Sequence, residues 1–343
     1  MTVTIKDVAK AANVAPSTVS RVIANSPRIS EETKKRVKKV MDDLGYHPNL
    51  NARSLVSQSS QTIGIVLPSA GNIVFQNPFF SEVLRSISEG VHHRHYALQL
   101  TTGNTENEIY EDVIRMVQGR RVDGLILLYS KVDDQVSAYL EKIGFPFVLV
   151  GKPYRNINTI THVDNDNILA AKDATEYLLK LGHRDIGFIG GSKNLMVTND
   201  RLEGYKQALK EMNLSIREEY IVHGEFLLED GQEAVKNLLA LKTPPSALLV
   251  VDDLMSVGVL RAIYDMKLNV PDDLSIISFN NALFAELSTP PLTSVDINIF
   301  ALGMESVKSL IDKIENPNEP IKRIIIPHQI IERHSCNQIF VKV

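Results

Sequence analysis

The chain contains little cysteine and no long apolar run. Its single cysteine, Cys336, cannot form an internal disulfide, which suits a reducing compartment. No apolar run reaches the roughly 20 residues that a membrane-spanning helix needs. The first residues, MTVTIKDVAKAANV, contain no apolar region of the kind found in a secretion signal. We therefore expect a cytoplasmic protein with no membrane partner.

Motifs of common catalytic and metal sites are also absent from the sequence. There is no G-x-S-x-G segment, IGGSKN lacks the G-K-[ST] run of a phosphate-binding loop, and DNDN at 164–167 lacks the glycine and final glutamate of a calcium loop. His92, His93 and His95 are close in sequence, but adjacent histidines diverge on a helix, which favours a solvated helix end. We expect no catalytic residue, no metal and no cofactor, and therefore not an enzyme.

Positive charge is concentrated near the start of the chain. Residues 1–60 contain ten lysines and arginines and five carboxylates, a net charge of +5. Because the whole chain carries −4, the remaining residues carry −9. This asymmetry predicts that only the first segment meets a polyanion.

Residues 4–45 show the pattern of three short helices. Thr4 is a helix-capping residue type and precedes the apolar periodicity that starts at Ile5. Pro16 stands in the first turn of a second helix, where proline is best tolerated. Ser30 can cap a third helix, and Gly45 ends it. Two short helices at a tight turn, braced by a third, form a helix-turn-helix, whose second helix enters the major groove of DNA.

The second of these helices is unusual in its polar face. The segment APSTVSRVIAN (15–25) contains hydroxyls and one arginine but no carboxylate. Ser17, Ser20 and Arg21 are predicted to project outward, where they can bond to phosphates and base edges. A solvated polar face in a small helical bundle is the alternative interpretation.

The same residues carry a family resemblance that extends over the whole chain. TIKDVAKAANVAPSTVSRVIAN and GYHPNLNARSL resemble the LacI/GalR family of bacterial transcription regulators. YHPNLNARSLVSQSS and FQNPFFSEVLR are similar to maltose-operon repressors of Gram-positive bacteria. The resemblance implies that the following residues contact DNA: Thr4, Pro16, Ser17, Thr18, Ser20, Arg21, Asn25 and Tyr46.

Among these residues, the resemblance assigns different contacts. Pro16, Ser17 and Arg21 would face base edges, and Thr18 and Ser20 would contact the DNA backbone. Pro16 departs from the large side chain often found at its position and cannot hydrogen-bond a base. Ser17 and Arg21 would therefore supply more of the polar recognition.

Residues 48–57 join the basic segment to the rest of the chain. By resemblance they form a hinge helix that orders on DNA, with Leu55 wedged into the minor groove and Asn49, Ala52 and Arg53 beside it. A helix this short is marginal alone in water. A plain tether between domains is the alternative.

From residue 61 onward, short apolar runs alternate with helical stretches. This pattern predicts α/β architecture with parallel sheets covered on both faces. Two similar series, with IGIV at 63–66 and IGFI at 186–189, predict two lobes. The resemblance implies a periplasmic-binding-protein-like body that binds an effector and dimerises. We expect a first lobe at about 61–162 and 292–325 and a second at about 163–291 and 326–343.

Ligands in such sheets bind beyond the carboxyl ends of the strands, here in the cleft between the lobes. Carboxylates, amides, an arginine and aromatic faces suit a polyhydroxylated sugar. The predicted effector-binding residues are Ser69, Phe79, Lys152, Asp164, Arg201, Phe226, Asp252 and Asn280. Arg201 matches the family's ligand-gripping arginine, whereas Asn280 stands where the family often has aspartate. Asp164 and Asp253 have helix capping as an equal alternative.

The predicted function is a repressor of sugar-utilisation genes, released from its operator by maltose or a related glucoside. The expected partners are double-stranded, pseudo-palindromic operator DNA and a second copy of the chain. A dimer is favoured over a tetramer because no C-terminal leucine heptad is evident. Two alternatives stay open. One keeps the DNA function under a phosphoprotein corepressor, and the other is a solute-binding protein.

Overall fold

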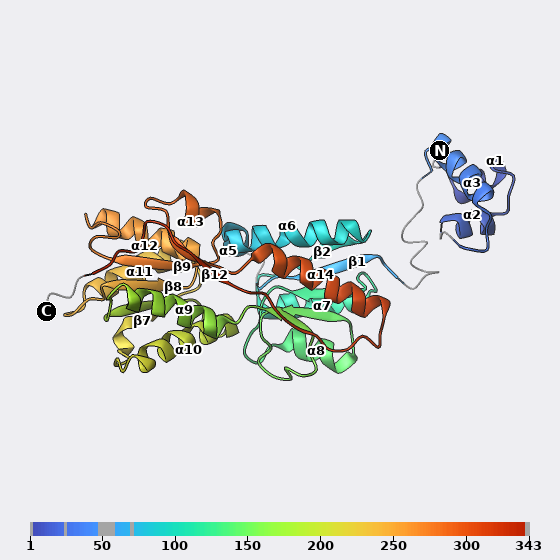
Figure 1. The fold of residues 1–343 in the computed structure, drawn as a ribbon. Coiled ribbons are helices and arrows are strands. Elements are labelled where there is room, and N and C mark those ends of the chain that lie inside the picture. Colours follow the sequence, from blue (N-terminus) through green and yellow to red (C-terminus); the bar gives the residue numbers. More distant parts are fainter. Residues whose placement is uncertain (1–2, 24–25, 47–58, 69–71, 340–343) are drawn as a thin grey trace. The chain divides into compact units, whose positions relative to one another are not determined.

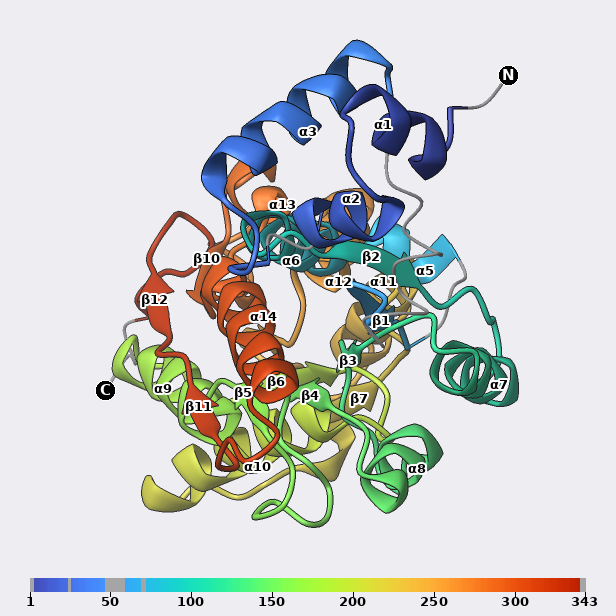
Figure 2. The same cartoon turned by 90° about the vertical axis from the view of Figure 1, so that its right-hand side faces the viewer.

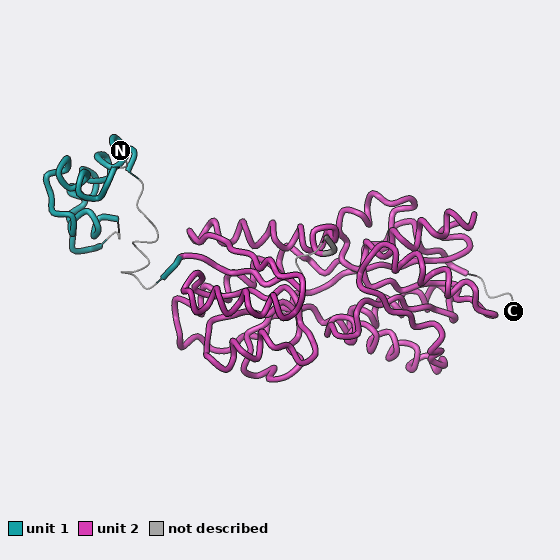
Figure 3. Tube along the Cα trace, turned by 180° about the vertical axis from the view of Figure 1, so that it is seen from behind, with its two compact units in different colours: residues 1–60 teal, residues 61–343 magenta. Residues whose placement is uncertain are grey.

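The structure, a computed structural model, describes residues 3–23, 26–46, 59–68 and 72–339. The chain divides into two compact units, residues 1–60 and 61–343 (Figure 3). Each unit has a hydrophobic core of its own. Within the described ranges, no helix combines the length and apolarity needed to cross a bilayer.

The first unit contains the three predicted helices, α1 (Ile5–Ala11), α2 (Pro16–Ile23) and α3 (Glu31–Asp43). Thr4 precedes α1, and both its backbone N–H and its hydroxyl donate to Asp7. Ser30 caps α3 by accepting from the Thr33 N–H. The apolar residues at helical spacing meet in one core, formed by Val8, Ala9, Ala12, Val19, Val22 and Val37.

The first lobe of the second unit is built on a six-stranded sheet in the order β11-β5-β4-β3-β1-β2 (Figure 1). Its strands are β1 (Thr62–Val66), β2 (Ala97–Leu100), β3 (Gly124–Leu127), β4 (Phe147–Val150), β5 (His162–Asp164) and β11 (Arg323–Ile325). Its helices are α5 (Asn72–Gln76), α6 (Pro78–His93), α7 (Glu106–Gln118), α8 (Gln135–Ile143) and α14 (Ile299–Glu315). Helices α6 and α14 cover one face, and α7 and α8 cover the other (Figure 2).

The second lobe repeats this plan with the strand order β12-β10-β9-β8-β6-β7. Its strands are β6 (Ile186–Gly190), β7 (Ile221–His223), β8 (Ala247–Val250), β9 (Ser275–Phe279), β10 (Thr293–Asp296) and β12 (Gln329–Ile331). Its helices are α9 (Asn167–Lys180), α10 (Met196–Glu211), η1 (Glu218–Tyr220), α11 (Leu228–Leu239), α12 (Asp253–Asp265) and α13 (Leu283–Leu287). All pairings are parallel except β10 with β12.

The central strands are buried on both faces, as their continuous apolar runs predict. Every residue of β3, β4, β8 and β9 is buried. The helices complete this burial with apolar stripes, such as Val83, Ile87 and Val91 on α6. Parallel strands covered on both faces bring their carboxyl ends to one edge, and this edge of each lobe carries the candidate effector residues.

The chain crosses between the lobes three times, after β5, after β10 and after β11. The expected first lobe included residues 292–296, and this boundary was wrong. Strand β10 pairs with β9 and β12 in the second sheet, where Thr293, Ser294 and Val295 are buried before the chain returns to α14. The side-chain Nδ2 of Asn165 donates to the carbonyls of Ile297 and Ile326, both at 2.9 Å. One buried amide thereby ties all three crossing segments together.

Candidate functional site

The polar face predicted on α2 is present in the structure. Ser17, Ser20 and Arg21 are exposed, whereas Val19 and Val22 are buried in the unit's core. No acidic residue occurs in α2, and no ion pair between described residues involves Arg21. The helix therefore presents donors without a competing negative charge, which is what contact with phosphates and base edges requires.

The remaining predicted DNA-contacting residues fall in different places. Thr4 and Pro16 are exposed, Thr18 is half-buried, and Tyr46 is partly buried against the core of the unit. The packing of Tyr46 gives it a structural role in addition to the predicted one. Asn25, Asn49, Ala52, Arg53 and Leu55 lie outside the described residues.

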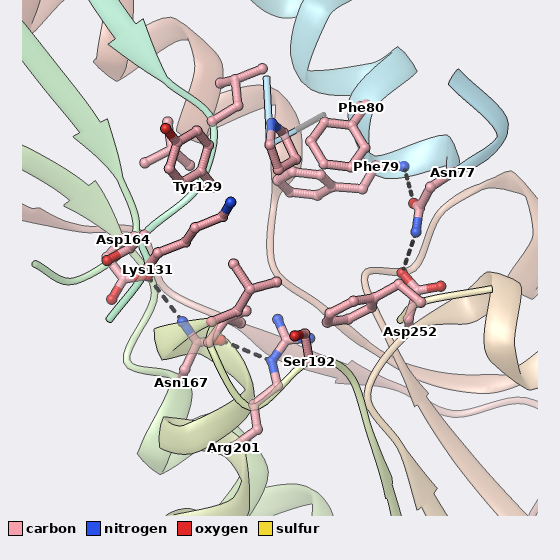
Figure 4. Close-up of a pocket in the computed structure, with 18 of the residues that line it drawn as sticks. Asn77, Phe79, Phe80, Tyr129, Lys131, Asp164, Asn167, Ser192, Arg201 and Asp252 are labelled. Carbon is pink, nitrogen blue, oxygen red and sulfur yellow. Dashed lines mark hydrogen bonds between the residues drawn. The ribbon is translucent and has the colours of Figure 1, made fainter. Parts of the chain in front are cut away.

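A cavity of about 420 Å³ lies between the two lobes of the second unit (Figure 4). The first lobe contributes Phe79 and Phe80 from α6 and the loops that follow β3 and β4. The second lobe contributes residues from α10 and from the ends of β8 and β9. This volume is typical of a site for a small organic ligand.

Arg201, on α10, is the most constrained cation of the cavity wall. It is only 4% exposed, and burial lowers its pKa to about 10, which leaves it charged at neutral pH. Its Nε donates to Asn167 Oδ1 (2.9 Å) and its Nη1 to the Val251 carbonyl (2.6 Å). The guanidinium carbon lies 4.1 Å from the centre of the Phe279 ring. These contacts fix the plane of the guanidinium and leave Nη2 for another acceptor.

Asp164 and Asp200 are the acidic residues on the same side of the cavity as Arg201. Asp164 accepts from Asn167 Nδ2 at 3.0 Å, so that Asn167 links it to Arg201. Burial raises the pKa of Asp164 to about 7. Asp200 pairs with Lys152 Nζ at 3.2 Å, and this ion pair joins the two lobes. Burial also raises the pKa of Asp200, with Lys152 acting against the shift.

Asp252 occupies the opposite side of the cavity, where it caps α12. Its Oδ1 accepts from the N–H groups of Leu254 (2.9 Å) and Met255 (3.3 Å). Its Oδ2 accepts from the amides of Asn77 and Asn280, both at 2.9 Å. An aspartate at position 280 would place two carboxylates in contact, so the departure to asparagine is explained by its role as a donor to Asp252.

Comparisons with known proteins agree with this organisation. Residues 4–49 match the model described as bacterial regulatory proteins, lacI family, and residues 175–336 match the periplasmic binding protein-like domain. The HTH-type transcriptional regulator MalR of Streptococcus pneumoniae serotype 4 is 45% identical over 340 residues, covering 97% of this chain and all of that protein. The chain belongs to the lacI family of bacterial regulatory proteins.

Two solved structures of transcriptional regulators are similar along most of the chain. The complex of the transcriptional regulator CelR with cellobiose has 29% identity and a TM-score of 0.77, covering 97% of this chain and 99% of that one. A "probable maltose operon transcriptional repressor malR" from Staphylococcus has 30% identity and a TM-score of 0.74, covering 81% and 98%. This lacI-family chain is therefore a DNA-binding transcriptional regulator.

The structure brings most of the predicted effector-binding residues of this lacI-family chain together. The following residues line the cavity: Phe79, Lys152, Asp164, Arg201, Phe226, Asp252 and Asn280. Ser69 lies outside the described residues. The capping alternative for Asp164 was wrong, because Asp166 caps α9. Asp253 does not line the cavity, since its carboxylate is enclosed by Ser278, Ser294 and the Ala282 N–H.

Several cavity residues were not predicted. They include Asn77, Tyr129, Lys131, Asn165, Asn167 and Asp200. Tyr129 and Lys131 follow β3, so the rule of strand carboxyl ends could have found them. Asn77 had a different signal, because an asparagine followed by proline marks the start of α6. The three neighbouring histidines are exposed at the end of α6, as predicted.

Proposed function

We propose that this chain is a dimeric repressor of sugar-utilisation genes that leaves its operator when a small sugar, maltose or a related glucoside, occupies the cavity between the lobes. The observation that carries the proposal is the donor set around that cavity, centred on Arg201. With Nε and Nη1 engaged within the protein, Arg201 Nη2 carries two N–H groups that can donate to adjacent hydroxyls of a sugar ring.

The balance of polar and aromatic groups supports a sugar. Phe79, Phe80, Tyr129 and Phe226 give the cavity apolar surfaces against which the C–H face of a sugar ring can pack. Phe79 and Phe80 meet edge to face, with ring centres 5.2 Å apart. Asp164 and Arg201 add an acceptor and a donor within the same space. Hydroxyl groups need both kinds of partner.

The charges of the cavity favour an uncharged ligand. Lys152 is paired with Asp200, and Lys131 Nζ is paired with Glu106 at 2.9 Å. Asp252 and Glu225 are further acids of the lining, and Asp164, whose pKa burial raises to about 7, is only partly ionised at neutral pH. Arg201 is then the one cation of the described lining without an ion-pair partner, and it stands among several acids, so the cavity offers a phosphate group little positive charge, whereas a neutral sugar needs only hydrogen-bonding partners.

The phosphoprotein-corepressor alternative predicts a different controlling surface, outside the cavity. The presence of a ligand-sized cavity lined by a fixed arginine favours direct control by a small molecule. A titration of the chain with maltose and, separately, with a phosphorylated carrier protein distinguishes the two.

The proposed switch works through the lobes. A sugar that touches both lobes stabilises one arrangement of them over another. We propose that this arrangement sets whether the hinge segments of a dimer, residues 48–57, can order on the operator with Leu55 in the minor groove. The pseudo-palindromic operator follows from the two-fold symmetry of such a dimer.

Replacing Arg201 tests the proposal directly. The Arg201→Ala variant is expected to bind operator as the wild type does without sugar but to show no release at maltose concentrations that release the wild type. The loss of a charged, fixed donor predicts at least a tenfold higher sugar requirement. Fluorescence anisotropy of labelled operator, with and without maltose, measures both quantities.

The matched control is Arg261→Ala, which removes an exposed arginine from α12 outside the cavity lining. It should release operator at the wild-type maltose concentration. Normal release by Arg201→Ala would mean that Arg201 is structural and that the effector binds elsewhere.

A further inference from the structure

We propose that Asn77 is an interlobe latch, whose amide competes with a sugar hydroxyl for Asp252 and thereby couples occupancy of the cavity to separation of the lobes. The inference rests on the proposed function, since it concerns how that ligand acts. Asn77 precedes α6 in the first lobe, and Asp252 precedes α12 in the second (Figure 4).

The hydrogen bonds of Asp252 leave no vacant position for a ligand. A carboxylate has about four lone-pair positions, and this one accepts from two backbone N–H groups and two side-chain amides. Asp252 is 2% exposed, yet it lines the cavity. A hydroxyl that donates to Asp252 must therefore displace one of the four donors.

The donor most easily displaced is Asn77. The N–H groups of Leu254 and Met255 belong to the helix that Asp252 caps, so they move with it. Asn280 also belongs to the second lobe, and its own N–H is bound to the Val295 carbonyl at 2.9 Å. Asn77 alone among these donors comes from the first lobe, so a change in lobe separation withdraws it while the capping bonds of Asp252 to α12 stay in place.

Release of this bond would act on α6. Asn77 Oδ1 accepts from the Phe79 N–H at 3.0 Å, which fixes the first turn of the helix. That turn carries Phe79 and Phe80 into the cavity (Figure 4). The latch therefore joins the side of the cavity that carries the two phenylalanines to the side that carries Asp252. The ion pair between Lys152 and Asp200 joins the lobes on the opposite side of the cavity from Asp252.

Backbone contacts between the lobes provide a readout that needs no ligand. The Val132 N–H donates to the Asn194 carbonyl (2.9 Å), and the Met196 N–H donates to the Ser130 carbonyl (3.0 Å). Both bonds cross from one lobe to the other. Opening of the lobes breaks them, so the hydrogen–deuterium exchange rates of these two amides report the population of open molecules.

The test uses Asn77→Ser in the full chain. Serine keeps an oxygen able to cap α6 but lacks the amide that reaches Asp252. Without a latch to displace, maltose should bind about tenfold more tightly by calorimetry. The Val132 and Met196 amides should also exchange several-fold faster in the absence of sugar.

Asn77→Asp serves as a second variant, because it also keeps a capping oxygen and places a carboxylate opposite Asp252. It should change affinity and exchange in the same direction. Asn104→Ser makes the same substitution at an exposed loop position of the first lobe and should match the wild type in both measurements.

Unchanged or weaker maltose binding by both Asn77 variants, with wild-type exchange at Val132 and Met196, would overturn the latch. A wild-type chain that binds no maltose would instead contradict the proposed function. In that case the exchange rates still test whether Asn77 holds the lobes together. Faster exchange of the Val132 and Met196 amides in the variants supports the latch, and unchanged exchange overturns it.

Discussion

Asp164 is a buried carboxylate at the carboxyl end of β5, and burial raises its pKa from 3.8 to about 7. The folded chain therefore keeps this proton up to about pH 7, whereas the unfolded chain releases it near pH 4. Between these values the folded state binds more protons, so the contribution of Asp164 to stability falls as the pH rises through this window.

Asp164→Asn should remove this dependence, because an amide does not ionise. The wild type is expected to lose about 2–3 kcal/mol of unfolding free energy relative to the variant between pH 5 and pH 8. Urea unfolding at both pH values measures the difference. Asp272→Asn, at an exposed position, is the control and should follow the wild type. Parallel stability curves for wild type and Asp164→Asn would show that the carboxyl ionises normally in the folded state.

At the scale of elements, Asn165 links the three crossings between the lobes by hydrogen bonds. Its amide is buried and serves two carbonyl oxygens on different crossing segments, Ile297 and Ile326. Asn165 also lines the cavity, which places the crossings next to the ligand. The segments that connect the lobes are thus held together where they pass one another.

Asn165→Ala should destabilise the second unit by about 2–4 kcal/mol, because two carbonyls lose their buried donor. Urea unfolding followed by circular dichroism measures the change. Asn318→Ala removes an exposed loop asparagine and is expected to have an effect within about 0.5 kcal/mol. Wild-type stability for Asn165→Ala would mean that the crossings do not depend on this amide.

The elements themselves were largely predictable from the sequence. Apolar periodicity and capping residues gave the three helices of the first unit, and continuous apolar runs gave the buried strands. The rule of strand carboxyl ends located Lys152, Asp252 and Asn280 beside one cavity. The lobe boundary near residue 292 was wrong, because local pattern does not say which of two sheets a strand joins.

The same reasoning could not predict contacts between residues that are far apart in the sequence. Asn77 and Asp252 are separated by 175 positions, and each has an ordinary local role as a helix cap. Asn167 itself was considered only as part of a calcium loop, whereas its amide hydrogen-bonds to both Asp164 and Arg201. Such pairs depend on how the lobes meet, which propensity and spacing do not encode.

At the scale of the whole molecule, charge and ligand chemistry are divided between the two units. The first 60 residues carry +5 and include a helix without carboxylates, while the rest of the chain carries −9 and contains the cavity. A regulator built this way needs the two functions to be coupled. In our account the coupling is reciprocal, since a sugar that weakens operator binding must bind more weakly when operator is present.

Calorimetric titration of the full chain with maltose, alone and saturated with operator DNA, tests this coupling most directly. The account predicts that operator raises the dissociation constant of maltose by the same factor by which maltose raises that of the operator, within the 5- to 150-fold range typical of coupled sites. Equal maltose affinity in the two titrations would contradict the claim that the cavity controls release from DNA.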